Sequence, residues 1–175
     1  RMGPGPYDVV IDADLAPGHL SWGECVVPGS TDGVGIVYTH ACHPSLANDN
    51  LSGIALAAAL ARALGGVSRR YSYRFLFLPG TIGAIAWLAQ NEAGTARIRH
   101  GLVVACVGDA GPMHYKRSRR GNAEIDRAAA HVLQHSGREH RLLDFSPYGY
   151  DERQYCSPGF DLPVGSLTRT PHGRY

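Results

Sequence analysis

Strand-forming and helix-forming segments alternate along most of this chain, and that alternation constrains its fold more than any other feature. Short apolar runs typical of buried strands occur at residues 34–39, 73–78, 102–107 and 162–167. Segments rich in helix-forming residues lie at residues 51–64, 82–92 and 122–135. Strands separated by helical connections favour a parallel sheet with helices on its faces. The sequence therefore predicts a three-layer α/β domain.

The first 32 residues differ in character from the rest. A β-branched run at Tyr7–Ile11 predicts one short strand, and a stretch punctuated by Pro and Gly follows it through Gly33. We interpret residues 1–32 as the tail of a smaller flanking module and residues 33–175 as the core domain. The start, Arg1-Met2-Gly3-Pro4, resembles a fragment boundary, so we expect the chain to be part of a longer protein.

Positive and negative charges nearly balance in this chain. It carries 17 basic and 15 acidic residues among 175, which gives a net charge of +2 with neutral histidines. Nucleic-acid-binding surfaces usually need a stronger basic bias, so nucleic acid is not an expected partner. The one basic cluster, Lys116-Arg117-Ser118-Arg119-Arg120, has two interpretations: a solvated loop, or a contact for an anionic ligand or a substrate carboxylate.

Cysteine usage and hydropathy indicate the compartment. The four cysteines, Cys25, Cys42, Cys106 and Cys156, are widely spaced and form no CxxC pair, which favours reduced thiols in a cytoplasmic protein. No run approaches the roughly 18 to 20 apolar residues that span a bilayer, and the first residues lack the order of a signal peptide. We therefore expect no membrane partner, and the oligomeric state stays open.

Three side chains that can bind metals stand near the ends of predicted elements. His43 and Asp109 follow strands, and Asp49 stands at a helix start. Imidazole and carboxylate are the ligands of hydrolytic zinc sites, and α/β sheets place their sites at the carboxyl ends of strands. Taken singly, each has a plain alternative, because a strand-end His is commonly hydrogen-bonded and an Asp before a helix is commonly an N-cap. Both interpretations stay open on this pattern alone.

A serine or cysteine hydrolase is a rival interpretation. The chain has no Gly-x-Ser-x-Gly elbow, and Cys42 or Cys156 would need a lowered thiol pKa to act as a nucleophile. The metal interpretation is therefore preferred among the enzyme classes.

Four longer motifs resemble a bacterial aminopeptidase-like family related to the zinc aminopeptidases, which share their fold with glutamate carboxypeptidases and glutaminyl cyclases. The motifs are HACHPSLANDNLSG at 40–53, LPGTIG at 78–83, VGDAGP at 107–112 with KRSRRG at 116–121, and DERQYCSPG at 151–159. The resemblance implies a zinc exopeptidase-like fold, which is an α/β three-layer sandwich with a mixed, largely parallel central sheet flanked by helices.

The resemblance also implies a ligand set and a substrate class. His43, or His40 as its alternate, corresponds to the first metal ligand, Asp49 to the carboxylate that bridges or adjoins two zinc ions, and Asp109 to a further ligand. The implied cofactor is one or two zinc ions, and the implied substrate is a small peptide or an amino-acid-like molecule. The candidate substrate contacts are Lys116, Arg117, Arg119, Arg153 and Tyr155.

This chain departs from the family pattern at two places. The family has a glutamate, which takes a proton from the metal-bound water, where this chain has Gly80. The last His ligand of the family lies beyond Tyr175, and His172 is not expected to replace it. Glu152 is the candidate catalytic base in place of the missing glutamate, with an ion pair to Arg153 or Arg169 as the alternative. The resemblance further predicts that the 151–155 segment lines the pocket and that Cys156 is buried.

The expected function is therefore that of a metal-dependent exopeptidase or amidohydrolase that cleaves a small amino-terminal or amino-acid-like group. The alternative is a non-catalytic binding or interaction domain on the same fold, which Gly80 favours. Because a general base contributes roughly 10² to 10⁴ in rate, we expect no measurable aminopeptidase turnover by this chain on simple aminoacyl anilides.

Overall fold

A seven-stranded sheet runs through the centre of the molecule, in a computed structural model that describes residues 3–174. The strands are β1 (Gly23–Val27), β2 (Val34–His40), β3 (Ser72–Leu78), β4 (Ile98–Val104), β5 (Met113–Lys116), β6 (His140–Leu143) and β7 (Val164–Thr168). The α-helices are α1 (Ser52–Gly65), α2 (Ile82–Gln90), α3 (Glu124–His135) and α4 (Glu152–Tyr155). Two irregular helical turns, η1 (Ala47–Leu51) and η2 (Glu92–Arg97), precede α1 and β4.

The sheet is mixed and largely parallel, as the sequence predicts. Its strand order is β1-β3-β2-β4-β7-β5-β6. The pairs β2–β3, β2–β4, β4–β7 and β5–β6 are parallel, whereas β1–β3 and β5–β7 are antiparallel. Parallel neighbours require crossover connections, and α1 and α2 provide two of them.

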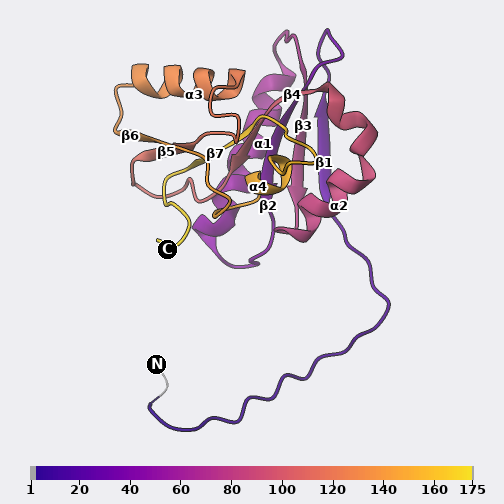
Figure 1. Ribbon diagram of the computed structural model, residues 1–175, viewed down its shortest axis with the longest axis vertical. Helices are drawn as coiled ribbons and strands as arrows, with labels where there is room; N and C mark the ends of the chain where they lie inside the picture. The colour runs from indigo at the N-terminus through magenta and orange to yellow at the C-terminus, as the bar shows by residue number, and fades with distance from the viewer. Residues whose placement is uncertain (1–2, 175) are drawn as a thin grey trace.

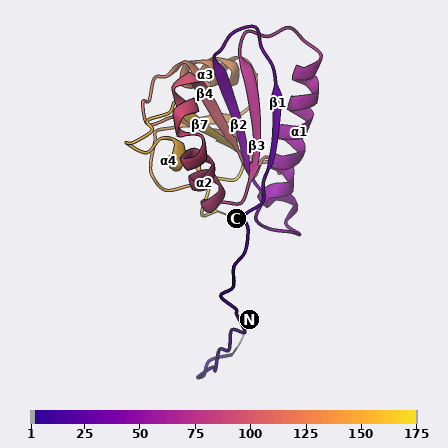
Figure 2. The ribbon, with the colours of Figure 1, turned by 90° about the vertical axis from the view of Figure 1, so that its right-hand side faces the viewer.

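Helices cover both faces of the sheet and complete three layers (Figures 1 and 2). In Figure 2, α1 lies on one side, and α2 with α4 lies on the other. Each side has its own apolar cluster: Ala57 of α1 packs with Val37 and Phe75 of the sheet, whereas Tyr38 and Leu76 pack beneath α2 and α4. This alternation along β2 explains why all seven of its residues are buried. The predicted fold class is confirmed.

The structure differs from the sequence expectations at several elements. Residues 7–11 form no strand, and the side chains of Val9, Val10 and Ile11 are 79%, 89% and 81% exposed. That strand prediction is wrong, because β-branched residues stabilise a strand only when a partner strand and a packed face are present. Conversely, β1 precedes the expected boundary at residue 32 and pairs with β3 as an edge strand of the same sheet.

The parallel strands β2, β3 and β4 all end at the same edge of the sheet. His40 and Leu78 close β2 and β3 and are paired in register. The loops that leave this edge therefore bring residues distant in sequence to one place. Within residues 3–174, the structure has no helix that is both long and apolar enough to cross a membrane.

Candidate functional site

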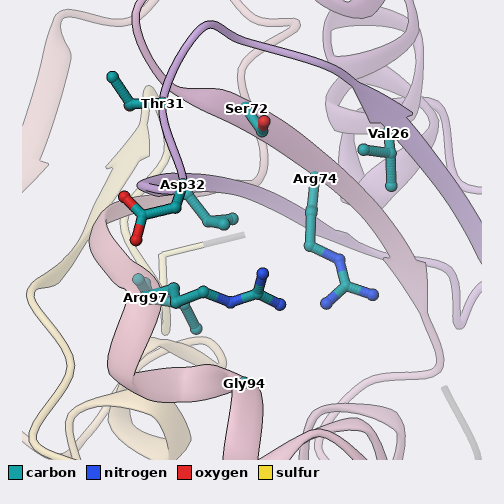
Figure 3. A pocket seen from close by; sticks show the side chains of 9 residues that line it. Val26, Thr31, Asp32, Ser72, Arg74, Gly94 and Arg97 are labelled. Carbon is teal, nitrogen blue, oxygen red and sulfur yellow. The ribbon is translucent and has the colours of Figure 1, made fainter.

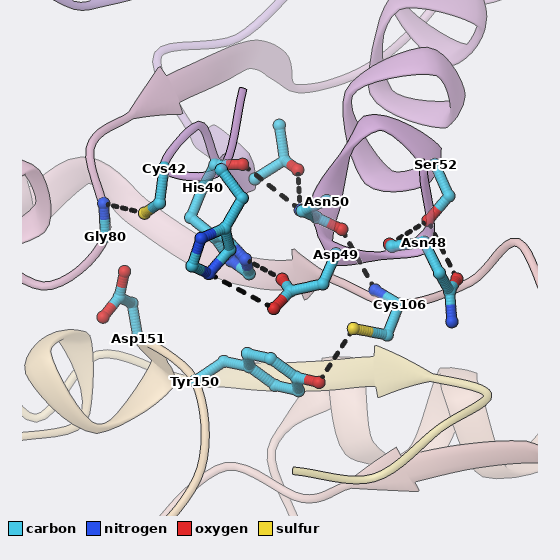
Figure 4. Close-up of polar contacts among 12 residues, drawn as sticks. His40, Cys42, Asn48, Asp49, Asn50, Ser52, Gly80, Cys106, Tyr150 and Asp151 are labelled. Carbon is cyan, nitrogen blue, oxygen red and sulfur yellow. Dashed lines mark hydrogen bonds and ion pairs between the residues drawn. The ribbon is translucent and has the colours of Figure 1, made fainter. Parts of the chain in front are cut away.

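A small pocket opens where β2 and β3 end, and it is called the Asp49 pocket below. It has a volume of about 130 Å³. Its lining residues are His40, Cys42, His43, Asp49, Gly80, Thr81, Gly149, Tyr150, Asp151 and His172. They come from the end of β2 and the segment through η1 that follows it, from the loop after β3, from the segment that leads into α4 and from the stretch after β7. Chain segments far apart in the sequence thus build one site, most of which Figure 4 shows.

Asp49 lies between the two imidazoles of the HACHP motif. Asp49 Oδ1 is 2.6 Å from His40 Nε2, and Asp49 Oδ2 is 3.5 Å from His43 Nε2. The Asp49 and His40 side chains are buried, while the His43 side chain is 51% exposed. The His40 ring also stacks on Tyr150, with ring centroids 5.6 Å apart. His43 is therefore the imidazole at this carboxylate that is open to a ligand.

The polar run before α1 fixes the position of Asp49. Asn50 donates from Nδ2 to Thr39 Oγ1 at 2.7 Å, and its Oδ1 accepts the Cys106 N–H at 3.0 Å. Asn48 Oδ1 accepts the Gly108 N–H at 2.8 Å. These side chains are unfavourable helix formers, and here each is used to join η1 to the ends of β2 and β4. The run therefore holds the Asp49 carboxylate in place.

Asp151 is a second buried carboxylate in the same pocket. It accepts hydrogen bonds from the Thr81 N–H at 2.9 and 3.0 Å, from Thr81 Oγ1 at 3.2 Å, and from the Tyr38 hydroxyl. Thr81 has a φ of 59°, which is uncommon for a β-branched residue. Because such strain persists only where surrounding contacts hold it, Asp151 is the group that fixes the Gly80–Thr81 turn.

Cys42 occupies the space beside Gly80. The Gly80 N–H donates to Cys42 Sγ at 2.8 Å, and a Cβ placed on Gly80 would lie 2.5 Å from that sulfur. Partial burial raises the pKa of the Cys42 thiol, and the carboxylates of Asp151 and Asp49 raise it further, while the Gly80 N–H opposes them. A thiol with a raised pKa stays protonated at neutral pH, which argues against a cysteine nucleophile.

The electrostatic character of the Asp49 pocket is acidic. Asp49 and Asp151 contribute two carboxylates, and none of the residues that line it is Lys or Arg. Two carboxylates around so small a volume favour a cation, either an ammonium group or a metal ion.

Asp109 lies outside this pocket and ties three loops together. Its Oδ2 accepts bonds from Asn48 Nδ2 at 2.9 Å and Thr170 Oγ1 at 2.5 Å, and its Oδ1 accepts the Gly111 N–H at 2.7 Å. Burial alone would raise the pKa of Asp109, but these three hydrogen bonds and the charge of Arg169 outweigh it, so the pKa is lowered. The structure thus brings His43 and Asp49 together and leaves Asp109 aside.

A complete zinc site is not assembled by these residues. Among residues 3–174, no group of three or more His, Cys, Asp and Glu side chains is arranged to hold a metal ion. Asp49 contacts two imidazoles, and Asp109 accepts hydrogen bonds from Asn48, Gly111 and Thr170. The predicted last ligand would follow Tyr175, which lies outside the described residues. The donor set that the structure describes therefore does not fit the implied zinc ions.

The remaining predicted residues are spread over three places. Glu152 is fully buried and forms an ion pair with Lys116, in place of either arginine partner expected. Arg117 pairs with Asp144 at 2.7 Å. Arg119 and Arg153 are exposed and line a separate cavity near α4. Tyr155 is buried against Tyr38 and Trp87. Cys156 is buried, as expected.

A larger cavity lies at the opposite edge of the sheet, where β2, β3 and β4 begin. It measures about 420 Å³, and Asp32, Arg74 and Arg97 extend into it (Figure 3). Arg74 already pairs with Glu24 and bonds to Asn91. Volume alone is a weak guide to a site, and α/β sheets place theirs at the carboxyl edge, so the Asp49 pocket is the better candidate.

Comparison with known proteins places the chain in a family. Residues 6–175 match the family described as "Domain of unknown function (DUF4910)". The chain belongs to this family. A Clostridium acetobutylicum protein described as "Putative polysaccharide biosynthesis protein with aminopeptidase-like domain" is 51% identical over 167 residues. That match covers 95% of this chain and 38% of the relative, so the chain spans well under half of the relative's length.

Solved structures extend the comparison to the fold of this DUF4910 chain. A crystal structure of a "putative peptidase" from Clostridium acetobutylicum is 50% identical, with a TM-score of 0.85 over 87% of this chain and 36% of that one. A zinc aminopeptidase from Bacillus subtilis is 16% identical, with a TM-score of 0.70 over 87% of this chain and 40% of that one. The predicted aminopeptidase-like family and fold are confirmed.

Proposed function

We propose that this chain is an aminopeptidase-like domain whose Asp49 pocket binds the free amino end of a small peptide or an amino-acid-like molecule. The observation that supports this most directly is the pair of buried carboxylates, Asp49 and Asp151, in a pocket lined by neither Lys nor Arg. An ammonium group satisfies such a pocket by charge and by hydrogen bonding. The aminopeptidase-like domain named in the 51% identical relative agrees with this substrate class.

Binding without rapid hydrolysis is the activity that we propose for this chain by itself. Gly80 provides no carboxylate to accept a proton, and Cys42 fills the space beside it. Glu152 is turned toward Lys116 in a neighbouring cavity and does not line the Asp49 pocket. A missing base typically costs roughly 10² to 10⁴ in rate. Turnover of aminoacyl anilides is therefore expected to be below detection.

A metal-dependent exopeptidase or amidohydrolase is the second candidate. The close approach of His43 to Asp49 favours it, as does the shared fold with a zinc aminopeptidase. The chain covers 38% and 36% of two longer relatives. Hydrolytic activity should therefore be assayed in the full-length protein as well. On this candidate, one or two zinc ions would be required, and chelation would abolish the activity.

A binding experiment tests the first proposal. L-alaninamide is titrated into the protein and followed by calorimetry, with N-acetyl-L-alaninamide as the probe that lacks an ammonium group. Alaninamide should bind, the acetylated probe should not, and Asp49→Asn or Asp151→Asn should weaken binding at least tenfold. Asp161→Asn, which alters a half-exposed carboxylate paired with Arg120, is the matched control. Equal binding of both probes would contradict the proposal.

A turnover assay separates the two candidates. Hydrolysis of alanyl-p-nitroanilide is measured with added zinc and again after chelation, on this chain and on the full-length protein. No hydrolysis by either form, together with alaninamide binding, supports the binding function. Fast hydrolysis that chelation abolishes would instead support the metal-dependent enzyme.

The cellular location proposed for the domain is the cytoplasm. All four cysteines are free, and Cys25 and Cys42 are exposed. Exposed unpaired thiols suit a reducing compartment.

A further inference from the structure

A second cavity adjoins the Asp49 pocket, and it is called the Glu152 cavity below. It measures about 340 Å³ and shares Gly149, Tyr150 and His172 with the Asp49 pocket. We propose that the Glu152 cavity is a specificity subsite that accepts a neutral hydrogen-bond donor, a hydroxyl or a carboxamide, on the side chain of the bound molecule. This inference rests on the proposed function, because the amino end would occupy the Asp49 pocket.

The cavity is built around a buried ion pair. Lys116 at the end of β5 contacts Glu152 at the start of α4, and their side chains are 13% and 0% exposed. Lys116 Nζ also donates to the carbonyl oxygens of Ser146 at 3.2 Å and Tyr148 at 2.9 Å. The contact with Glu152 is an ion pair and not a hydrogen bond, and the two carbonyls take two of the three ammonium hydrogens. The two carbonyls and the charge of Glu152 therefore hold the Lys116 ammonium group in place.

Glu152 is in the opposite situation. Its Oε1 forms the ion pair with Lys116, but neither Oε1 nor Oε2 has a hydrogen-bond partner among residues 3–174, and Oε2 has no ion pair either. Buried polar atoms are nearly always hydrogen-bonded, because an unpaired one retains the full cost of losing water. Glu152 also lines the cavity. The unpartnered oxygen is thus an acceptor that a donor entering the cavity would satisfy.

Charge decides which kind of donor fits. Lys116 already neutralises Glu152, so a second ammonium group would bring an uncompensated positive charge into a buried space. A carboxylate would be repelled by the negative charge of Glu152, and an apolar group would leave Oε2 unpaired. A neutral hydroxyl or carboxamide N–H satisfies the oxygen and keeps the local charge at zero.

A buried polar residue of the sheet, Ser166, also lines the Glu152 cavity. Ser166 of β7 is paired in register with Lys116 of β5, so their side chains share one face of the sheet. On the other side, the backbone at Gly149 lies against the ion pair, since a Cβ there would be 2.7 Å from Glu152 Oε1 and would also strike Lys116 Nζ. Gly149 lines both cavities, and the close approach leaves no room for a side chain at this shared position.

An affinity comparison between matched amides tests the inference. L-threoninamide and L-valinamide are nearly isosteric and differ by a hydroxyl in place of a methyl group. L-glutaminamide and the α-amide of L-glutamate differ by a carboxamide in place of a carboxylate, and L-lysinamide adds an ammonium group. Each is titrated into the protein by calorimetry. We expect threoninamide to bind at least tenfold more tightly than valinamide, and glutaminamide to bind more tightly than either charged amide.

The double variant Lys116→Met/Glu152→Gln provides the structural control. It removes both charges together, so no buried charge is left unpaired, and a thermal melt verifies that it folds. In this variant the preference for threoninamide over valinamide should fall at least threefold, while binding of L-alaninamide should stay within twofold. The parent protein and the variant are measured with the same samples of each amide.

The outcomes separate this inference from the proposed function. If none of the amides binds, both are overturned. If the amides bind with equal affinity, only water satisfies Glu152 Oε2, and the inference fails while the proposed function stands. If the preference persists unchanged in the double variant, the discrimination arises elsewhere and the inference is likewise overturned.

Discussion

Asp151 and Glu152 are adjacent in the sequence, yet they lie in contrasting surroundings. Asp151 faces the Asp49 pocket and accepts hydrogen bonds from Tyr38 and Thr81. Glu152 lines the second cavity and pairs with Lys116, and in the part of the chain that the structure describes neither of its oxygens has a hydrogen bond. The start of α4 therefore places one carboxylate at each cavity, and the two differ in their hydrogen bonding. The hydrogen bonds to Asp151 fix the neighbouring turn while its negative charge lines the Asp49 pocket, whereas Glu152 retains acceptor capacity for a ligand.

The largest expected effect comes from breaking the ion pair on one side. Lys116→Met would leave Glu152 buried with no counter-charge. Removing one partner of a buried pair typically costs about 3 to 5 kcal/mol of unfolding free energy. Urea denaturation followed by circular dichroism measures this cost. The double variant Lys116→Met/Glu152→Gln should recover most of the loss, and a double variant as unstable as the single one would contradict this account.

A smaller loss is expected from Asp151→Asn. The amide keeps the shape but weakens the charge-assisted bonds from Tyr38 and Thr81, each worth roughly 1.5 to 3 kcal/mol at most, so a net cost of about 2 kcal/mol is expected. Differential scanning calorimetry measures it. Asp161→Asn, in a half-exposed ion pair, should have almost no effect, and an equal loss in both variants would show that burial is irrelevant here.

The contact between Gly80 and Cys42 should give a coupled effect. Gly80→Ala places a Cβ 2.5 Å from Cys42 Sγ, and overpacking of this kind costs about 1 to 2 kcal/mol. In a Cys42→Ala background the same change should be nearly neutral. Denaturation of the two single variants and the double variant gives the coupling energy. Additive effects would mean that the two side chains do not compete for this space.

The smallest expected loss of stability comes from changing Asp109, a third carboxylate, which accepts hydrogen bonds from Asn48, Gly111 and Thr170. Asp109→Asn should cost about 1 kcal/mol at neutral pH through weaker hydrogen bonds. The pKa of Asp109 is lowered in the folded protein, so its contribution is complete above the ordinary carboxyl range and is lost as the pH falls through the lowered value. Parent and variant stabilities measured from pH 7 down to pH 2 should therefore converge. A difference that stays constant in acid would exclude this origin.

The sequence predicts the strands and helices that depend on local pattern. The Ala- and Leu-rich run became α1, and the apolar runs became β2, β3 and β7. The short strands β5 and β6 contain His, Lys and Arg and are only partly buried, so they lack the apolar signal. The edge strand β1 is mostly exposed, and its pairing with β3 depends on contacts some 50 residues away.

The sequence predicted the candidate site only for residues whose place next to a strand end also determines where their side chains lie. His43 and Asp49 follow one strand end closely, and they meet. The orientation of Asp109 depends on Thr170, which lies 61 residues away, and local sequence does not encode such a partner. The Lys116–Glu152 pair was missed for the same reason. The sequence signal that could have suggested the pair is Lys116 itself, a single Lys at the end of a sheet strand. A Lys that becomes buried there needs a carboxylate partner.

The hydrogen bonds from Tyr38 and Thr81 to Asp151, which complete the Asp49 pocket, also determine when the pocket can form during folding. Asp151 is 113 residues from Tyr38 and 70 from Thr81 along the chain. Closing long loops carries an entropic cost, and contacts of high sequence separation form slowly. In a chain synthesised from its amino terminus, β2 and β3 emerge long before residue 151 does. The ribosome-bound intermediate would therefore have a sheet edge with no pocket, and ligand binding would begin only when α4 has docked.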